Sequence, residues 1–191
     1  MTEPHLRELI LAAGLASLHQ NGYHATGVED IARVAGVAKG VFYGYFESKE
    51  ALGAEVVERY GFNGAGPPVL ADQSIPPKTR LRLHFAGLND MFSDKDFMHG
   101  CLLGNFSAEL GDSSPMIRQR LAAVYEAWTA DLASAIGAGQ ADGSITSRFP
   151  SAHLAMFILD AWEGALLRAR VAKTRQALDV FLAVGLETAL S

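Results

Sequence analysis

Apolar residues recur every three or four positions along most of the chain, which is the spacing of amphipathic helices. Near the start this pattern predicts a helix that ends at Asn21-Gly22, a second helix that begins at Thr26, and a third from about Ala38 to Tyr45. Thr26 with Glu29 three residues later has the sequence of a capping box, in which both side chains bond to free backbone N–H groups. Gly36 supplies the unusual backbone conformation needed to leave the second helix.

The remainder of the chain keeps the helical spacing and has no alternation long enough for a strand. A further helix starts after Ser48 and is interrupted by GFNGAGPP, residues 61–68, whose glycines and prolines a helix does not tolerate. Later helices are expected from Pro77 through Phe92, and over 96–110, 115–136, 150–172 and 174–190. We therefore predict an all-α fold with an N-terminal domain of residues 1–50, continuing into a connector helix 48–61, and a second helical domain of residues 51–191.

The third helix is short and most of its positions face outward. Its inward positions are Val37, Phe42 and Phe46. Its outward positions are Lys39, Gly40, Val41, Tyr43, Gly44 and Tyr45. Donors to phosphate oxygens would come from Lys39, Tyr43, Tyr45 and Lys49. Two short helices joined by a glycine-containing turn place the second helix in the major groove of DNA, and the outward glycines permit close approach. The alternative is a helical hairpin with a solvated face.

The run NGYHATGVEDIARVAGVAKGVFYGYFESKEAL, residues 21–52, resembles the signature of the TetR family of transcriptional repressors. The resemblance implies that Thr26 and Lys49 bind DNA phosphates from the N-termini of two helices, where the helix dipole favours an anion. It also implies a recognition surface made of Lys39, Gly40, Val41, Tyr43, Gly44 and Tyr45. The chain departs from the family pattern at Ala38, which cannot cap the recognition helix, and at Gly44, which replaces a large polar or aromatic residue. Base recognition is expected to differ accordingly.

The charge of the chain limits how it can bind DNA. The 191 residues carry a formal net charge of −5, and residues 1–50 hold four basic against six acidic side chains, a net charge of −2. A protein that coats nucleic acid through bulk electrostatics would be basic. Binding must therefore rely on a few cations concentrated on the DNA-facing side, and we expect weak non-specific binding with a modest salt dependence.

No residue pattern points to a metal, a cofactor or a disulfide framework. The single cysteine, Cys101, excludes an internal disulfide and a multi-cysteine zinc site. His5, His19 and His24 lack a carboxylate or cysteine partner at ligand spacing. The N-terminal sequence MTEPHLRELI is acidic where a secretory signal is basic and then apolar, and no uncharged apolar run is long enough to span a membrane. A cytoplasmic protein is expected.

The final predicted helix is too apolar over its circumference to be a lone surface helix. One face of the helix over residues 150–172 carries Phe157, Ala161, Gly164 and Arg168. The final helix adds Leu178, Phe181, Leu182, Gly185 and Leu186. Small residues on both helices allow their axes to approach closely, so we predict a two-fold, four-helix interface between two copies, which the family resemblance also implies. The alternative is that both helices bury these residues within their own subunit.

A candidate effector site surrounds the cysteine. On a helix over residues 96–110, one face would carry Cys101, Asn105 and either Ala108 or Glu109. The aromatic residues expected to wall an apolar cavity around that face are Phe85, Phe106, Trp128 and Trp162. The alternative is that the cysteine is a small buried hydrophobic residue in an aromatic core.

Two further motifs, GCLLGNFSAEL at residues 100–110 and DAWEGALLRARV at residues 160–171, extend the resemblance. They are similar to a TetR subgroup that includes an acrylate-responsive repressor and an electrophile-sensing repressor whose matching cysteine is reactive. This resemblance implies that Cys101 is a candidate sensor thiol or lines the effector pocket. The residues we expect to shape that pocket are Cys101, Asn105, Trp128 and Trp162.

These observations predict a transcriptional regulator rather than an enzyme, because no Ser–His–Asp order, metal quartet or phosphate-binding glycine loop supports catalysis. Residues 1–50 would form a three-helix helix-turn-helix DNA-binding domain, and residues 51–191 an effector-binding and dimerisation domain. We expect a repressor that binds palindromic operator DNA as a homodimer and that a small-molecule effector releases by favouring a second conformation. Alternatives are a transcriptional activator, and a helical small-molecule-binding protein or enzyme with a vestigial DNA-binding domain.

Overall fold

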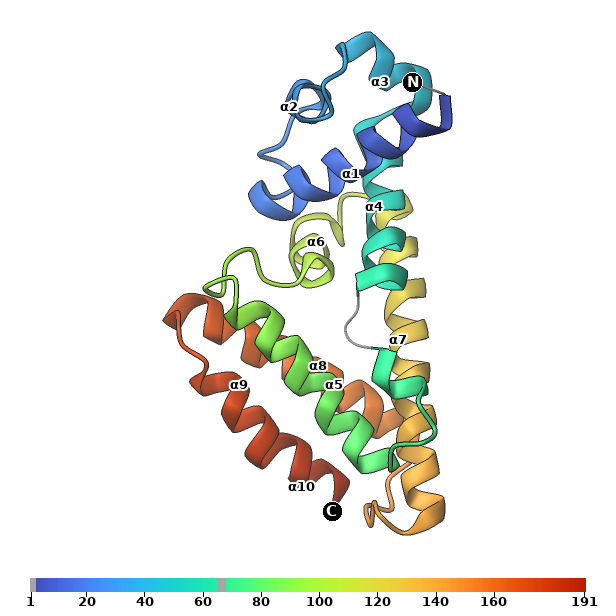
Figure 1. Ribbon diagram of the computed structural model, residues 1–191, viewed down its shortest axis with the longest axis vertical. Coiled ribbons are helices and arrows are strands. Elements are labelled where there is room, and N and C mark those ends of the chain that lie inside the picture. The colour runs from blue at the N-terminus through green and yellow to red at the C-terminus, as the bar shows by residue number, and fades with distance from the viewer. Residues whose placement is uncertain (1–2, 65–67) are drawn as a thin grey trace. The chain divides into compact units, whose positions relative to one another are not determined.

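The computed structural model describes residues 3–64 and 68–191, with side chains at 5–61 and 68–191, and the regular elements of these residues are all helices (Figure 1). The helices are α1 Glu3–Asn21, α2 Val28–Val34, α3 Lys39–Tyr45, α4 Lys49–Gly64, η1 Pro68–Ala71, α5 Pro77–Ser93, α6 Leu102–Leu110, α7 Pro115–Asp142, α8 Ser151–Ala172, α9 Gln176–Val180, η2 Phe181–Leu186 and α10 Glu187–Leu190. Of these, η1 is a 3₁₀ helix and η2 is a π-helix. The all-α prediction is confirmed.

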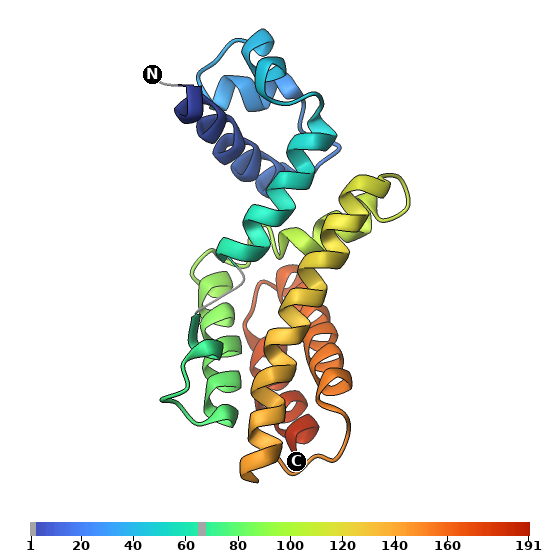
Figure 2. The ribbon, with the colours of Figure 1, turned by 90° about the vertical axis from the view of Figure 1, so that its right-hand side faces the viewer.

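The chain forms two compact units. The head unit comprises Met1–Gly64 with Cys101–Val124, so α6 and the first part of α7 cluster with α1 to α4. The body unit comprises Ala65–Gly100 with Tyr125–Ser191. Within the body unit, α5, α8 and the segment from α9 to α10 lie side by side (Figures 1 and 2). The segment that begins at Cys101 therefore belongs to the same unit as α3.

Two glycines allow close helix crossings in the head unit. A Cβ atom at Gly14 would lie 2.6 Å from Cδ2 of Leu52, where α1 crosses α4. A Cβ atom at Gly61 would lie 2.2 Å from Cγ1 of Val124, where α4 meets α7. The prediction that the helix breaks at Gly61 is wrong, because α4 continues to Gly64 and the glycine makes room for the valine.

The segment before α6 is not helical. The predicted helix from Asp96 begins only at Leu102, because four residues ahead of it have left-handed backbone conformations. These are Asp96, Phe97, His99 and Gly100, with φ of 51°, 54°, 68° and 65°. A right-handed helix needs negative φ at every residue. Cys101 is consequently the extended N-cap residue of α6, and it does not share a helix face with Asn105.

The last helix runs without a break but changes its winding at η2. The core side of this helix is formed by Leu178, Phe181, Leu186 and Leu190, which are at most 5% exposed. Leu186 lies five positions after Phe181, which is more than the roughly 3.6 residues of an α-helical turn. The wider π-turn, with hydrogen bonds from i to i+5, lets both side chains face the core.

Candidate functional site

The helix-turn-helix begins one residue later than the sequence predicts. Gly27, not Thr26, is the N-cap of α2, and its N–H donates to Oδ2 of Asp30 at 3.1 Å. The predicted capping box of Thr26 and Glu29 is therefore wrong. The hydroxyl of Thr26 instead donates to the carbonyl of Gly22 at 2.8 Å, and Thr26 is 1% exposed. Hydrogen bonds from Arg33 and then from Gly27 lower the pKa of the Asp30 carboxyl.

The short helix α3 presents the expected surface. Phe42 and Phe46 are buried, as predicted, and Ala38 is an N-cap without a side-chain hydrogen bond. The outward residues Lys39, Gly40, Tyr43 and Gly44 are exposed, whereas Val41 and Tyr45 are half-buried. A Cβ atom at Gly40 or Gly44 would meet nothing within 4 Å. This surface leaves the backbone of α3 accessible to a closely approaching duplex.

The lysine of the short helix α3 forms an ion pair. The ammonium of Lys39 donates to Oε1 of Glu29 on α2 at 2.8 Å, and this hydrogen bond raises the pKa of Lys39. Both side chains are largely exposed. A phosphate group must therefore compete with the Glu29 carboxylate for the same ammonium.

The second predicted phosphate ligand, Lys49, holds the loop between α1 and α2. Its ammonium donates to the carbonyls of Tyr23 at 3.0 Å and Thr26 at 2.9 Å, and lies 4.1 Å from the centre of the Tyr23 ring. Burial lowers the pKa of Lys49, and the charge of Glu109 opposes that shift. The expectation that the Thr26 side chain binds phosphate disagrees with its burial, because a direct contact needs an exposed hydroxyl. The ammonium of Lys49 retains donor capacity for a phosphate.

Helix α6 also contacts the α1–α2 loop, residues 22–27. The N–H of His24 donates to Oε2 of Glu109 at 3.0 Å, and the rings of Tyr23 and Phe106 meet edge to face at 5.8 Å. Gly22, with φ of 87°, passes so close to Glu109 that an added Cβ atom would lie 2.9 Å from Oε1. Sequence reasoning missed these contacts, because nothing local pairs residues that lie 85 positions apart. The loop is thus held by α4 and by α6.

The four predicted effector residues fall into two pairs. Cys101 and Asn105 belong to the head unit, whereas Trp128 and Trp162 belong to the body unit. Cys101 is 4% exposed and Asn105 is half-buried. The structure brings Trp128 and Trp162 together, with ring centres 5.7 Å apart, and Phe85 lies 6.0 Å from Trp162. Phe85, Trp128 and Trp162 therefore form a buried aromatic cluster in the body unit, and their role as the wall of an effector cavity stays a prediction.

Buried polar side chains bond to both tryptophans. The indole N–H of Trp128 donates to Nε2 of His84 at 3.1 Å, and that of Trp162 donates to Oδ1 of Asn89 at 2.9 Å. Because an indole N–H only donates, Nε2 of His84 acts as the acceptor. His84 and Asn89 are 2% and 0% exposed. Sequence analysis did not single out either residue, although both lie on the apolar side of α5 at helical spacing.

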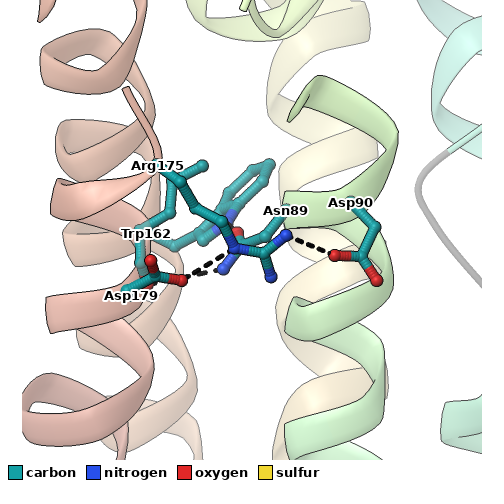
Figure 3. Close-up of polar contacts among 6 residues, drawn as sticks. Asn89, Asp90, Trp162, Arg175 and Asp179 are labelled. Carbon is teal, nitrogen blue, oxygen red and sulfur yellow. Dashed lines mark hydrogen bonds and ion pairs between the residues drawn. The ribbon is translucent and has the colours of Figure 1, made fainter. Parts of the chain in front are cut away.

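Arg175 ties the last helix to α5 beside this cluster (Figure 3). Its guanidinium donates to Asp90 of α5 at 2.5 Å and to Asp179 of α9 at 2.8 Å. Asn89, next to Asp90, donates to the carbonyl of Leu178 at 3.4 Å. These contacts fix the position of the last helix against α5 within the body unit.

The residues predicted for a dimer interface differ in how much of each is exposed in the single chain. On α8, Phe157 is 59% exposed, Gly164 and Arg168 are exposed, and Ala161 is half-buried. On the last helix, Leu182 and Gly185 are half-buried. Leu178, Phe181 and Leu186 are at most 5% exposed, so for these three the alternative of burial within the subunit is correct. Exposed apolar residues that the prediction omitted are Met156, Leu167, Val171, Val180 and Val184.

Among the described residues, no three or more His, Cys, Asp and Glu side chains are grouped so that they could hold a metal ion. Of the helices in the described part of the chain, none combines the length and the apolar character that crossing a membrane requires.

Two family models match the sequence. One, described as bacterial regulatory proteins of the tetR family, covers residues 10–56, and the other, described as a tetracyclin repressor-like C-terminal domain, covers residues 77–184. The chain is 35% identical over 192 residues to the HTH-type transcriptional repressor DhaR of Mycobacterium sp. (strain GP1), covering 100% of this chain and 95% of DhaR. It is 34% identical over 164 residues to the transcriptional regulator AcuR of Cereibacter sphaeroides, covering 85% of this chain and 75% of AcuR.

Solved structures agree with these matches. The crystal structure of the reduced form of E. coli NemR has a TM-score of 0.87 and 28% sequence identity, and the alignment covers 98% of each chain. A regulatory protein TetR from Rhodobacter sphaeroides has a TM-score of 0.85 and 32% identity over 94% of this chain and 96% of its own. The matches confirm the expectation of a transcriptional regulator and not an enzyme. The chain belongs to the TetR family of bacterial regulatory proteins.

Proposed function

We propose that the protein is a repressor that binds palindromic operator DNA as a homodimer and is released by a small-molecule effector. The observation that carries this proposal is the exposed side of α3, on a helix-turn-helix whose inward residues are buried. Residues 1–50 would serve as the DNA-binding domain, 48–61 as the connector, and 51–191 as the effector-binding and dimerisation domain. A regulator of this kind acts on the chromosome, so we also propose a cytoplasmic location.

Base recognition is proposed to come from α3, with Val41, Tyr43 and Gly44 nearest to the bases. Selection from random duplexes, followed by fluorescence anisotropy, tests this directly. Wild-type protein should enrich two related half-sites about 34–36 Å apart along the duplex. Val41→Thr and Gly44→Ser should change the preferred sequence, because they alter groups that face the bases and not the phosphates. Failure to enrich any duplex would refute the proposed function.

Dimerisation is proposed through α8 and the last helix. The exposed apolar residues Phe157, Val171 and Val184 belong to these helices, and burying them in a two-fold interface would remove apolar surface from water. The small side chains of Gly164 and Gly185 would let the helices approach closely. Sedimentation analysis should therefore find a dimer at micromolar concentrations, and a monomer under the same conditions would contradict the proposal.

The effector is proposed to act through Cys101 and Asn105 in the head unit and through Trp128 and Trp162 in the body unit. One relative of known structure, NemR, was solved in a form described as reduced. A buried thiol reacts slowly unless the protein opens, so we expect slow modification of Cys101 by N-ethylmaleimide, followed by loss of operator binding. If Cys101→Ser protein loses operator binding equally under the reagent, the thiol is not the sensor and a reversible ligand remains the proposed effector.

Helix α6 is proposed to transmit the effector signal, since it starts next to Cys101 and its far end bonds to the α1–α2 loop. Glu109→Ala removes the acceptor of the His24 N–H, whereas Glu109→Gln keeps an oxygen acceptor of the same size. We expect Glu109→Ala to weaken operator binding by about 10- to 150-fold and Glu109→Gln by much less, as removal of one hydrogen bond to a charged group implies. Glu58→Ala, which breaks an ion pair with Arg120 elsewhere in the head unit, is the matched control.

A further inference from the structure

Arg80, in the first turn of α5, is a buried cation with few partners. The residue is 8% exposed, and Nη1 donates to the carbonyl of Leu70 at 2.8 Å. Its Nε atom is buried without a hydrogen-bond partner among the described groups. None of the ion pairs formed by the described residues includes Arg80. A buried guanidinium left short of acceptors costs free energy, so the site favours an acceptor brought from outside.

A cleft of about 610 Å³ lies beside Arg80. It is lined by the segment ahead of α5, including Ser74 and Pro76, and by Ser134 and Asp142 of α7. Figures 1 and 2 show the first turn of α5 and the last turns of α7 at the same end of the body unit. The volume is within the range of about 300–1,000 Å³ found for small-molecule pockets. The cleft contains none of the residues proposed for the effector site.

The first turn of α5 lines the cleft through Pro76, Pro77 and Arg80. Its N-cap residue, Pro76, provides no side-chain hydrogen bond, and Pro77 follows at the first position. Neither proline has a backbone N–H, and the N–H of Arg80 donates to the carbonyl of Pro76 at 3.0 Å, so the backbone contributes the positive end of the helix dipole and no free donor from these three residues. The side chains of Arg80 and Ser134 are therefore the donors suited to an anionic oxygen in this cleft.

Two carboxylates limit the charge that the cleft can accept. Asp142 lines the cleft, and its carboxylate accepts from the N–H of Ser144 at 2.9 Å. Hydrogen bonds from Ser144, and to a smaller extent the charge of Arg80, lower the pKa of Asp142. Oδ1 of Asp72 likewise accepts two hydrogen bonds from Ser74, one from the N–H at 2.9 Å and one from the hydroxyl at 2.6 Å. With both carboxylates ionised near Arg80, a dianion would be repelled more than a monoanion.

We propose that this Arg80 cleft binds a small monocarboxylate, whose oxygens accept hydrogen bonds from the guanidinium of Arg80 and the hydroxyl of Ser134. A guanidinium matches the planar geometry of a carboxylate, which a spherical or tetrahedral anion does not match as well. The neighbouring Asp142 favours a ligand with a single negative charge.

Isothermal titration of the full-length protein with propionate and benzoate tests this proposal. Both acids should bind saturably with a Kd of about 1 mM or tighter, a range accessible to titration. The neutral analogues propionamide and benzamide should bind at least about tenfold more weakly, and inorganic phosphate should bind more weakly than propionate. Equal binding of the acids and their amides, or tighter binding of phosphate, would overturn the assignment.

Two variants locate the site. Arg80→Met should weaken propionate binding at least about tenfold because it removes the guanidinium, and thermal unfolding checks that the variant folds without the hydrogen bond to the Leu70 carbonyl. Asp142→Asn should tighten binding about two- to fivefold, because it removes a nearby negative charge while keeping an oxygen acceptor for Ser144. A purely structural role for these residues predicts no such gain. Unchanged binding in Asp142→Asn would overturn the proposal even if Arg80→Met did not fold.

Discussion

Replacing Gly61 with alanine should force α4 away from α7 and destabilise the head unit. The added Cβ would lie 2.2 Å from Cγ1 and 2.9 Å from Cγ2 of Val124, whereas carbon atoms pack at about 3.5–4.0 Å. Overpacking of this severity costs about 3 kcal/mol, the upper end of its usual range. The better helix propensity of alanine returns about 1 kcal/mol. We therefore expect a net loss of about 2 kcal/mol in the free energy of unfolding.

A double-mutant cycle in urea, at fixed protein concentration, measures this effect. In a Val124→Ala background the clashing atoms are absent, so Gly61→Ala should stabilise the protein by up to about 1 kcal/mol. The coupling between the two sites should be about 3 kcal/mol. Gly40→Ala, at a helical glycine whose added Cβ meets nothing within 4 Å, reports the propensity term alone. Equal effects of Gly61→Ala in both backgrounds would refute the close crossing.

Three further predictions concern DNA binding and assembly. Glu29→Gln should strengthen operator binding by about two- to tenfold at low salt, because it frees Lys39 and removes a negative charge near the phosphates, and the gain should shrink as salt rises. Lys49→Ala should weaken binding to all sequences evenly and reduce the salt slope by about 2 per dimer. A loss of affinity with an unchanged slope would instead assign Lys49 to support of the α1–α2 loop alone. Phe157→Glu should shift the dimer to monomer in sedimentation experiments by placing two charges in an apolar interface, whereas Met116→Glu, at a similarly exposed residue of the head unit, should not.

Local patterns were sufficient to predict most helices. The end of α1 at Asn21, the span of α3 and the inward direction of Phe42 and Phe46 follow from periodicity and from the position of glycines. The cap of α2 was misplaced because the sequence holds two adjacent acids, Glu29 and Asp30, each three residues after a possible cap. Only the burial of Thr26 against α1 decides between them.

Features that depend on distant contacts were not predictable. From the sequence alone, Gly61 is expected to end the helix. Its actual role depends on Val124, 63 positions later, whose side chain packs directly against the glycine. The start of α6 was missed because aromatic and charged residues rarely adopt positive φ, and nothing in the sequence marks Phe97 as an exception. The conformation of this segment involves a distant residue. Lys173, which follows α8, donates a hydrogen bond of 3.3 Å to the carbonyl of Phe97.

The same limit applies to the candidate sites. Lys39, Gly40, Tyr43 and Gly44 are exposed as the sequence predicts, whereas Val41 and Tyr45, also expected to face outward, are half-buried. Glu109 was considered only as a neighbour of Cys101, although its carboxylate bonds to His24. Arg80 drew no attention in the sequence, since a lone arginine at the start of a helix looks like an ordinary surface cation.

The π-turn in the last helix gives that segment an unusual tolerance to a change in length. Deleting one residue between Phe181 and Leu186 would shorten their spacing to that of a normal α-turn and keep both side chains, and Leu190 after them, directed at the core. Elsewhere in a buried helix the same deletion would rotate every later residue by about 100°. Natural relatives lacking one residue here would be expected to conserve the core and to differ chiefly at the outward positions around Val184, which are those proposed for the dimer interface.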